Sequence, residues 1–415
     1  MSKPRVVVTG LGTINPCGLD VDTTWDNLIH GRTGIGPITH FDPAPLNVRI
    51  AAEVKNFDPA NYMEGKEARR RDRFAQFAIA ATAQALKQAN LKIDESNADD
   101  IGVMIGTAVG GLQSWFDCVE TYITQGPRRM NPFTMTMIIA DSASAQVAII
   151  NGARGPNMAP VSACAAGADS IGLAYELLLR GDAKAMICGG SEATVTPMGI
   201  TSFDRLGAMS RENDNPATAC RPFSADRSGL VMGEGAAIFV VETLENALDR
   251  GAEPLAELTG YGCTCDAFHI SAPLEDGSGA VKAMRMALRH ADLQPADIDT
   301  INAHATATEL NDPTETLAIK TVFREHAYKV PISGTKSMTG HMMGATGALE
   351  ALMCVQAIRT GKVPPTINLR VPDPKCDLDY VPNVARDVPV RIAMTNAFGF
   401  GGHNSVLILQ RYEEN

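Results

Sequence analysis

The chain repeats part of its own sequence, and this repetition limits the folds that are open to it. Four short segments recur later in the chain, in the same order. The pairs are Val8–Gly12 with Leu258–Gly262, Ala85–Leu91 with Ala287–Leu293, Asp100-Ile101 with Asp297-Ile298, and Ser162–Ala168 with Thr339–Ala345. The separation between partners shrinks steadily, which indicates two copies of one unit, the first copy carrying extra segments.

We place the two copies at residues 1–253 and 254–415. The segment from about 196 to 234 is rich in Asn, Pro, Arg and Ser, and we interpret it as an insertion that lengthens the first copy. A chain of 415 residues is otherwise long enough for two or three separate domains. The repetition favours one duplicated unit instead.

Each copy alternates short apolar runs with longer helical patterns, which predicts an α/β fold. The predicted strands are Arg5–Thr9, Ile101–Ile105, Met186–Cys188 and Ala237–Val241. The predicted helices are Phe74–Asn90, Ala165–Arg180 before Gly181, and Gly347–Thr360 before Gly361. This alternation predicts mostly parallel strands covered by helices. Two such halves suggest a five-layered, pseudo-symmetric molecule.

Duplication also suggests where chemistry takes place. In the aligned repeats Cys164 and His341 occupy matching positions, each before a predicted helix. Equivalent helix N-termini can face each other across a pseudo-twofold axis. We therefore expect a thiol and an imidazole to meet in one cleft.

Composition excludes several functions. The 36 Lys and Arg against 47 Asp and Glu leave a net charge of −11, which argues against a general nucleic-acid binder. No run of 18 apolar residues is present, so we expect no membrane span. The charged start at Met1 does not resemble a signal peptide. Nine scattered cysteines then indicate free thiols in a reducing cytoplasm.

Cys164 is the strongest nucleophile candidate. Small residues surround it where an apolar run turns into a helix, and a helix N-terminus favours the thiolate. The alternative is a buried inert cysteine, which is the usual state of a free thiol in a protein.

Two histidines lie where predicted strands become loops, His304 and His341. The other six histidines, which we interpret as structural, are His30, His40, His269, His290, His326 and His403. Lys336 precedes His341 in the same loop and either anchors a salt bridge or tunes the histidines. Its candidate counter-charges are Asp312, Glu315 and Glu350.

The segment Asn396–Asn404 is dense in glycine, so its backbone N–H groups can converge on an anion. The pattern of this segment is consistent both with an oxyanion hole and with a phosphate-binding site. The chain has no G-x-x-x-x-G-K-[ST] motif, and the segment that begins at Gly10 lacks the last glycine of the dinucleotide fingerprint. Cys263 and Cys265 with His269 give only a weak indication of a metal site.

The segments around Cys164, His304, Lys336, His341 and Phe400 closely resemble the thiolase-fold condensing enzymes, and most of all the β-ketoacyl-acyl-carrier-protein synthases. The resemblance spans nearly the whole chain. Further segments that carry it are Gly189–Ala193, Arg221–Phe223 and Gly233–Gly235. It implies a five-layered αβαβα fold with two duplicated halves of mixed sheet.

The resemblance implies that Cys164 receives an acyl group as a thioester. His304 and His341 then hold a malonyl thioester and promote loss of carbon dioxide, and the carbanion extends the acyl chain by two carbons. The backbone N–H groups of Cys164 and Phe400 form the oxyanion hole. Lys336, Asp312, Glu315 and Glu350 form a charged network behind the histidines.

The resemblance also implies binding roles. Thr306 and Thr308 match positions that hold the pantetheine arm, Phe398 lies in the binding loop, and Phe400 matches a gate. Val109 matches a position at the acyl pocket of a dimer partner, so a homodimer is expected. Both substrates arrive on the 4′-phosphopantetheine of an acyl carrier protein, and neither a metal nor another cofactor is expected.

An acidic enzyme that binds an acidic carrier needs a local basic patch. The densest basic cluster in the chain is Lys66 to Arg73, and we predict that Lys66, Arg69 and Arg70 dock the carrier. The alternative is an ordinary solvated helix face.

Two other functions stay open. One is the condensing subunit of an aromatic polyketide synthase, and the other is a non-catalytic chain-length subunit, which the intact Cys-His-His set disfavours. The chain departs from the family at Ala305, Ala307 and His403, which stand where Gly, Ser and Thr are common. These departures bear on substrate preference rather than on the reaction.

Overall fold

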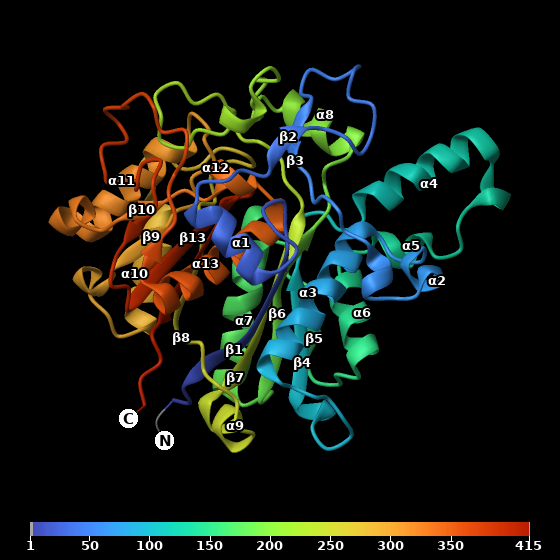
Figure 1. The fold of residues 1–415 in the computed structure, drawn as a ribbon, viewed down its shortest axis with the longest axis horizontal. Coiled ribbons are helices and arrows are strands. Elements are labelled where there is room, and N and C mark those ends of the chain that lie inside the picture. Colours follow the sequence, from blue (N-terminus) through green and yellow to red (C-terminus); the bar gives the residue numbers. More distant parts are fainter. Residues whose placement is uncertain (1–2, 415) are drawn as a thin grey trace.

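The computed structural model of this protein describes residues 3–414 (Figure 1). Over this range ten strands form one continuous sheet in the order β10-β9-β13-β14-β8-β1-β7-β6-β4-β5. These strands are β1 (Val6–Ile14), β4 (Ile101–Gly106), β5 (Asn157–Met158), β6 (Ala185–Glu192), β7 (Gly235–Thr243), β8 (Ala256–Cys265), β9 (Thr300–Asn302), β10 (Ile332–Ser333), β13 (Ile392–Gly399) and β14 (His403–Gln410).

The strand order is the same in both halves of this sheet. The first half runs β5-β4-β6-β7-β1, and the second half runs β10-β9-β13-β14-β8. The first strands of the two halves, β1 and β8, pair antiparallel through Val6–Val8 and Ala256–Leu258. The duplication predicted from the sequence is therefore visible in the topology.

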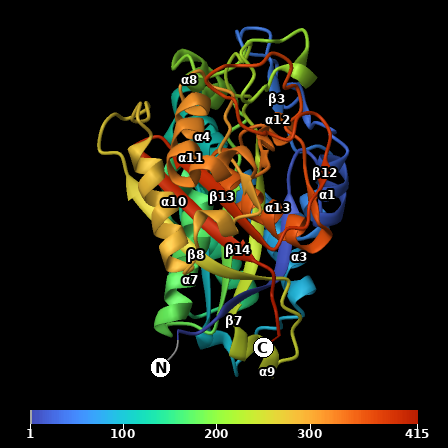
Figure 2. The same ribbon diagram turned by 90° about the vertical axis from the view of Figure 1, so that its left-hand side faces the viewer.

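Helices fill the space between the two halves and cover their outer faces. In the middle, α7 (Ala166–Arg180) and α13 (Thr346–Thr360) pack on each other and on strands of both halves. The outer helices on the first half are α3 (Arg73–Ala89) and α6 (Ser142–Asn151). Those on the second half are α10 (Ser278–His290) and α11 (Asn311–Phe323), which Figure 2 shows side by side. The result is the expected five-layered αβαβα arrangement.

Local sequence explains where these helices begin and end. The Asp72 side chain accepts a hydrogen bond from the Phe74 amide and caps α3, which ends at Asn90 in the left-handed conformation. Gly181 and Gly361 end α7 and α13 in the same conformation, as predicted. The three predicted helices agree with the observed bounds to within about one residue.

The repeated glycines have a packing role. A Cβ atom at Gly12 of β1 would lie 2.0 Å from the carbonyl oxygen of Ala81 on α3. A Cβ atom at Gly262 of β8 would lie 2.1 Å from the carbonyl oxygen of Ala283 on α10. Each half therefore needs glycine where its outer helix meets its first strand, which explains why both copies keep it.

The prediction of mostly parallel strands was wrong. Parallel pairing occurs between β4 and its neighbours β5 and β6, and between β9 and its neighbours β10 and β13. The other neighbours in the described sheet pair antiparallel. β13 returns directly into β14 through a short turn, and such a connection can only produce an antiparallel pair.

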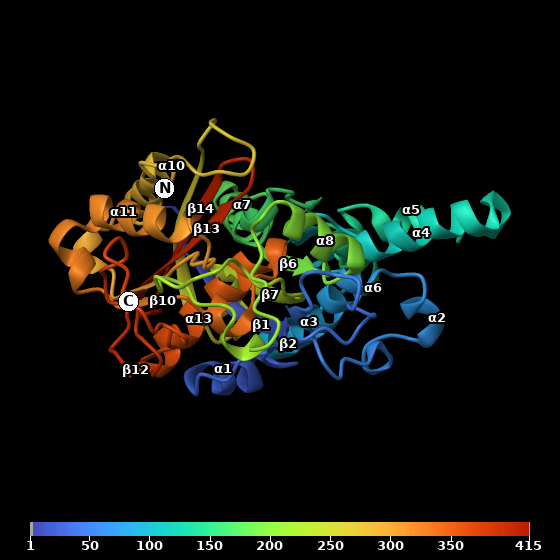
Figure 3. The same cartoon turned by 90° about the horizontal axis from the view of Figure 1, so that it is seen from above.

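The first half carries several insertions. Residues 196–234 form α8 (Pro197–Arg205) and irregular loops between β6 and β7, where the second half has only a short turn. A second insertion, which the sequence analysis missed, contains α4 (Leu112–Gln125) and α5 (Thr134–Ile138) and projects from the body of the molecule (Figure 3). A third contains α1 (Val21–Ile29), β2 (Ile35–Pro37), β3 (Ile50–Ala52) and α2 (Gly65–Ala68).

Shorter elements complete the chain, namely α9 (Leu244–Asp249), α12 (Lys336–Thr339), β11 (Lys362–Val363) and β12 (Arg386–Asp387). The boundary that we predicted after residue 253 falls in the loop between α9 and β8. Within residues 3–414, no helix combines the length and the apolar character that a membrane crossing requires.

Candidate active site

The N-terminal ends of α7 and α13 meet at the centre of the molecule. A Cβ atom at Gly167 would lie 3.1 Å from the Ala348 Cβ, and a Cβ atom at Gly347 would lie 3.0 Å from the Ala168 Cβ. These reciprocal contacts are what a pseudo-twofold axis between the two helices requires. The expectation that equivalent helix N-termini face each other is confirmed.

The structure corrects which residues are equivalent. Each central helix has 15 residues, and each follows a short 3₁₀ turn, Ala163–Ala165 before α7 and Met343–Ala345 before α13. Cys164 therefore corresponds to Gly344, and His341 lies about one helical turn earlier. The sequence alignment slipped because small residues recur throughout both turns.

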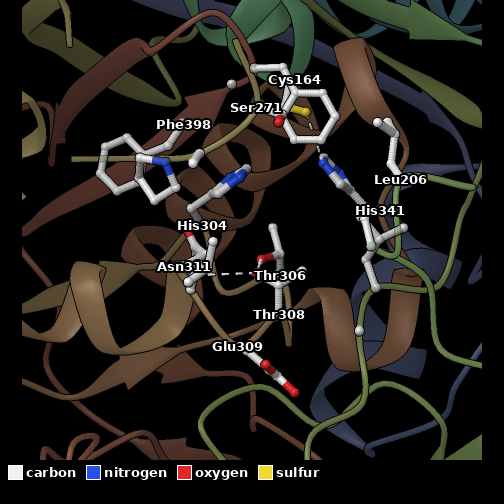
Figure 4. A pocket seen from close by; sticks show the side chains of 18 of the residues that line it. Cys164, Leu206, Ser271, His304, Thr306, Thr308, Glu309, Asn311, His341 and Phe398 are labelled. Atoms are coloured by element: carbon white, nitrogen blue, oxygen red, sulfur yellow. Dashed lines mark hydrogen bonds between the residues drawn. The ribbon is translucent and has the colours of Figure 1, made fainter. Parts of the chain in front are cut away.

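Cys164 and His341 nevertheless meet. The Sγ atom of Cys164 lies 3.1 Å from Nε2 of His341, and both side chains are buried (Figure 4). On the other side of the ring, Nδ1 of His341 lies 3.0 Å from the hydroxyl of Thr346, the first residue of α13. Ala163 holds a φ of 51°, so the turn that presents Cys164 is strained.

His304 completes the cluster from the loop after β9. Its ring meets that of His341 edge to face, with the ring centroids 5.5 Å apart. Phe398 packs on its other side at 5.7 Å. The Nδ1 atom of His304 is buried and has no hydrogen-bond partner within the described residues. The His304 imidazole is thus held by packing, and its polar atoms are not engaged with other side chains.

A buried ion pair lies behind the histidines. Lys336 is fully buried, and its Nζ atom donates to Glu350 Oε1 at 2.5 Å and to the backbone carbonyl of His304. Glu315 accepts hydrogen bonds of 2.8 Å from the backbone amides of His304 and Ala305. Lys336 and Glu315 together fix the backbone on both sides of His304.

Asp312 extends this network toward the inserted segment. It accepts hydrogen bonds from the Ala307 amide at 3.2 Å and from the Phe223 amide at 2.8 Å. Burial raises its pKa to about 6, although the hydrogen bonds from Phe223 and Asn311 and the Arg227 charge oppose that rise. The four charged residues expected behind the histidines are therefore gathered there.

Burial and charge keep the three central groups neutral. Burial, reinforced by the charge of Lys336, lowers the pKa of His304 and His341 well below the usual value. Burial raises the pKa of the Cys164 thiol to about 11, against the opposing charge of Lys336. Desolvation is the largest influence on this pKa, and it favours the thiol over the thiolate that we expected at a helix N-terminus.

Because Cys164 and His341 are both neutral, the direction of each hydrogen bond between them and Thr346 can be assigned. With Cys164 protonated, its thiol donates to Nε2 of His341, and the ring proton lies on Nδ1 and is donated to the Thr346 hydroxyl. A hydroxyl can both donate and accept. Thr346 can therefore also support the opposite tautomer, in which Nε2 of His341 carries the proton.

A cavity of about 350 Å³ opens from this cluster to the surface. Thr306, Thr308 and Phe398 line it, and the two threonine hydroxyls are 2.9 Å apart (Figure 4). Phe400 also lines the cavity. Phe400 stacks on Phe203 of α8 with ring centroids 5.9 Å apart. The cavity thus contains the Cys164 thiol, two phenylalanine rings and a pair of hydroxyls in its wall.

The glycine-dense loop touches the nucleophile. A Cβ atom at Gly399 would lie 3.0 Å from the amide nitrogen of Cys164, so the two backbones are in close contact. The Phe400 backbone N–H hydrogen-bonds to the Cys164 sulfur and moderates the rise of its pKa. Two backbone N–H groups therefore converge beside the sulfur, which suits an oxyanion rather than a phosphate.

Other predicted residues lie elsewhere. Val109 is 45% exposed in the loop after β4 and does not line the cavity. Lys66 and Arg69 are exposed at α2, and Arg70 stacks on Phe133 with 4.5 Å between its guanidinium carbon and the ring centre. Figure 1 places α2 at the opposite end of the molecule from α11.

The described structure does not bring Cys263, Cys265 and His269 together as a set of metal ligands. His269 Nδ1 accepts hydrogen bonds from the amides of Ser271 and Ala272, so it faces its own loop. Across residues 3–414, no three His, Cys, Asp or Glu side chains are grouped closely enough to hold a metal ion.

Sequence reasoning missed Thr346, Asn396 and Glu192. Asn396 donates to Glu315 at 3.2 Å. Glu192 accepts from the amides of Ala108 at 2.6 Å and Gly344 at 3.1 Å, and burial raises its pKa to about 7. A hydroxyl residue at the start of the helix that follows His341 was a usable signal for Thr346. The other two contacts depend on distant segments.

The structure shows the backbone conformation or surroundings of the three residues that depart from the family pattern. Ala305 and Ala307 have φ angles of 46° and 63°, a conformation that glycine adopts more easily. His403 lines the cavity, and its ring lies against Gly401 in the oxyanion loop. Of the six histidines assigned structural roles, it alone lines this cavity in the described chain.

Comparison with known proteins finds similarity along the whole chain. Residues 3–247 match the family described as Beta-ketoacyl synthase, N-terminal domain, and residues 255–370 match Beta-ketoacyl synthase, C-terminal domain. The chain is 51% identical to a 3-oxoacyl-[acyl-carrier-protein] synthase 2 from Synechocystis sp., covering 100% of this chain and 99% of the relative. It is 49% identical to one from Staphylococcus aureus, covering 99% of each.

Solved structures agree. A beta-ketoacyl synthase from Burkholderia phymatum is 34% identical, covers 99% of this chain and 100% of its own, and superposes with a TM-score of 0.91. A type II polyketide ketosynthase in complex with its acyl-carrier protein is also 34% identical, with the same coverage and a TM-score of 0.92. With its Cys-His-His cluster and these likenesses across both halves, the chain belongs to the β-ketoacyl synthase family.

Proposed function

We propose that this chain is a 3-oxoacyl-[acyl-carrier-protein] synthase that elongates fatty acids. The observation that carries the proposal is the contact between Cys164 and His341, with His304 beside them in a buried cavity. The relatives that are about half identical to this chain bear the same enzyme name.

The first step transfers an acyl group to Cys164. His341 accepts the thiol proton at Nε2, and the sulfur attacks the thioester carbonyl of the acyl carrier. The carbon–sulfur bond to the carrier then breaks, and the proton passes to the leaving pantetheine thiolate. The products are an acyl-Cys164 thioester and a free carrier thiol.

The second step removes carbon dioxide from a malonyl carrier. The carboxylate leaves as neutral carbon dioxide, and its electron pair forms an enolate with the charge on the thioester oxygen. His304 and His341 donate neutral N–H groups to that oxygen, which stabilises the charge without protonating the carbanion. Thr346 supports the His341 tautomer that this step needs.

The third step forms the new carbon–carbon bond. The carbanion attacks the acyl-Cys164 carbonyl, whose oxygen is held by the backbone N–H groups of Cys164 and Phe400. The carbon–sulfur bond breaks, the Cys164 thiolate takes up a proton from solvent, and a 3-oxoacyl carrier two carbons longer is released. These steps need no metal and no redox cofactor, since 4′-phosphopantetheine on the carrier is the only prosthetic group involved.

Intact-protein mass spectrometry tests this function. Incubation with an acyl carrier should add one acyl mass to Cys164, and a malonyl carrier should then yield carbon dioxide and a 3-oxoacyl product. An unmodified Cys164 together with no carbon dioxide would overturn the proposal. Carriers loaded with acyl chains of graded length would give the chain-length preference in the same assay.

We propose that an acidic carrier docks on the exposed basic residues of α2. Lys66 and Arg69 remain available there, whereas Arg70 is paired with Glu67 at 3.0 Å. A ketosynthase with this fold has been solved in complex with its acyl-carrier protein. Lys66→Glu with Arg69→Glu should raise KM for the carrier substrate about tenfold and spare a small acyl thioester.

The matched control for docking is Lys282→Glu, an exposed lysine on α10, far from α2 in Figure 1. It should leave KM for the carrier unchanged. Equal losses on carrier and small thioester in the α2 variant would show that the basic residues support the fold rather than docking. Arg70→Glu should be less selective, because it also breaks the Phe133 contact.

We propose that two copies of the chain associate through the face around β5. Exposed apolar side chains gather on the neighbouring helices, including Ile123 on α4, Met135 on α5 and Ile149 on α6, which are 75%, 65% and 76% exposed. β5 is also one of the two edge strands of the described sheet, so it can pair with a second copy. In such a dimer Val109 would approach the partner's cavity.

Light scattering tests the dimer, and Ile149→Lys on α6 should yield a monomer. An unchanged mass in that variant would exclude this face. We further propose a cytoplasmic location, which the nine free cysteines support, and cell fractionation tests it.

A polyketide ketosynthase is the second candidate, because structural neighbours include ketosynthases paired with a chain length factor. Pull-down of a tagged chain distinguishes the two functions. A stable partner related in sequence but lacking the cysteine would favour the polyketide function.

A further inference from the structure

A hydrogen-bonded group of three side chains lies beside the Cys164 turn and takes no part in the steps above. The Ser162 hydroxyl donates to one carboxylate oxygen of Asp169, in the first turn of α7. The Tyr261 hydroxyl, on β8, donates to the other carboxylate oxygen at 2.9 Å. The three side chains are 8%, 5% and 6% exposed, so these bonds form away from water.

The group connects the two halves of the molecule. Ser162 and Asp169 belong to the first half, whereas Tyr261 belongs to the first strand of the second half. The Tyr261 ring packs directly on α7, since a Cβ atom at Gly172 would lie 2.2 Å from it. Glycine at this helix position therefore leaves room for an aromatic ring from the other half.

Ser162 is placed to control the nucleophile turn. It immediately precedes Ala163, whose positive φ strains the turn that presents Cys164. The carbonyl oxygen of Ser162 also lies against Gly399, where an added Cβ would be 2.9 Å away, next to the oxyanion residue Phe400. A strained turn persists only where its surroundings hold it, and Ser162 is held by Asp169.

The positions related to these three by the pseudo-twofold axis are all apolar. Superposing α13 on α7 matches Asp169 with Leu349 and Ser162 with Met342, and the β1 repeat matches Tyr261 with Leu11. These three counterparts are buried in the central core. The scaffold is therefore stable with apolar residues at these positions, and the polar group occurs only beside the nucleophile.

We propose that Asp169 is a positioning residue which, braced by Tyr261, holds the Cys164 turn through Ser162 in the geometry needed for acyl transfer. Asp169 touches neither the substrate nor the sulfur in this arrangement. Its effect falls on the acyl-transfer step, because the histidines that promote decarboxylation are held by a separate network. The inference rests on the proposed function.

The test compares the two half-reactions in the full-length protein. In Asp169→Ala, the rate constant for acylation of Cys164 should fall about 10²-fold, as a displacement of about 1 Å does, with KM for the carrier unchanged. Decarboxylation of the malonyl carrier should stay within about twofold of the wild type. Asp169→Asn keeps an acceptor oxygen and should recover part of the acylation rate.

Two tyrosines provide a matched pair. Tyr261→Phe should slow acylation about tenfold, because Asp169 loses one of its two hydroxyl donors. Tyr175→Phe also removes a hydroxyl that joins α7 to β8, by a 3.1 Å bond to the Thr259 carbonyl, but it lies further along the helix from Cys164. It should leave acylation unchanged.

The outcomes separate this inference from the proposed function. No acylation of the wild-type chain overturns the proposed function. Normal wild-type acylation with an unchanged rate in Asp169→Ala, or with equal losses in both half-reactions, overturns the positioning role. If Asp169→Ala does not fold, Asp169→Asn and Tyr261→Phe test the positioning role instead. The measured quantity is again the rate of acylation relative to the rate of decarboxylation.

Discussion

The two halves of this molecule share a strand order and a central helix, yet they place different chemistry at the point where those helices meet. The first half presents Cys164 in a strained turn, held by hydroxyl groups and a single carboxylate. The second half presents two histidines, backed by the fully buried pair of Lys336 and Glu350. The geometry is symmetric and the residues are not.

This contrast indicates a division of labour. The first half supplies a covalent nucleophile, for which position matters most. The second half supplies neutral hydrogen-bond donors, whose protonation must be controlled, and it has the buried cation that lowers the pKa of both histidines. Only His341 serves both halves, because it contacts Cys164 directly. If this division holds, a substitution in one half should affect one half-reaction more than the other.

The largest effect is expected for Cys164→Ala. Acyl transfer and condensation should fall by about 10⁴-fold or more, as happens when a covalent nucleophile is removed. Decarboxylation of the malonyl carrier should continue, because His304 and His341 remain. Intact mass and released carbon dioxide measure the two activities on one sample. Loss of both activities would contradict the division between the halves.

His304→Ala should impair decarboxylation more than acylation, which is the opposite of the effect expected for Cys164→Ala. Decarboxylation should fall about 10²–10³-fold, the usual cost of removing one oxyanion donor. Acylation of Cys164 should fall much less, because His304 does not contact the sulfur. Rapid-quench assays of each half-reaction measure the ratio. A parallel loss of acylation would place His304 in both steps and remove its distinction from His341.

Lys336→Met tests the charge behind the histidines. Without this cation the pKa of both histidines rises, so they protonate at higher pH and the acidic limb of the decarboxylation rate moves upward. The pKa of Cys164 rises too, because Lys336 lowers it in the native protein. Rates measured from pH 5 to 8 would detect the shift.

The control for this prediction is Lys336→Met combined with Glu350→Gln. The single variant leaves a buried carboxylate unpaired, which costs about 3–5 kcal/mol of the free energy of unfolding. The double variant should recover much of that stability and keep the shifted pH profile. Recovery of the wild-type profile as well would assign the effect to folding rather than to charge.

The smallest effect is expected when backbone strain is relieved. Both halves contain alanines with positive φ angles near the catalytic side chains. Ala163→Gly and Ala305→Gly relieve positive φ angles of 51° and 46° and should each raise the free energy of unfolding by up to about 1 kcal/mol. Ala165→Gly, at a φ of −85°, should lower it by a similar amount. Chemical denaturation measures all three. Destabilisation by Ala163→Gly would mean that its methyl group outweighs the strain.

Much of the fold followed from the sequence because its signals are local or repeated. Helical periodicity with Gly181 and Gly361 as caps located α7 and α13, and the apolar run Arg5–Thr9 located β1. The projecting α4 and α5 left no such signal. Their pattern is that of any amphipathic helix, and nothing local says that their apolar face stays uncovered.

The sequence by itself determined the duplication, the central helices and the identity of Cys164, His304, His341 and Lys336 as the chemical candidates. Only the tertiary structure decided that Cys164 corresponds to Gly344, and that the thiol rests protonated. The physical reason is the same for both. Register between helices and desolvation of a side chain depend on neighbours that are distant in the chain, and local sequence does not encode them.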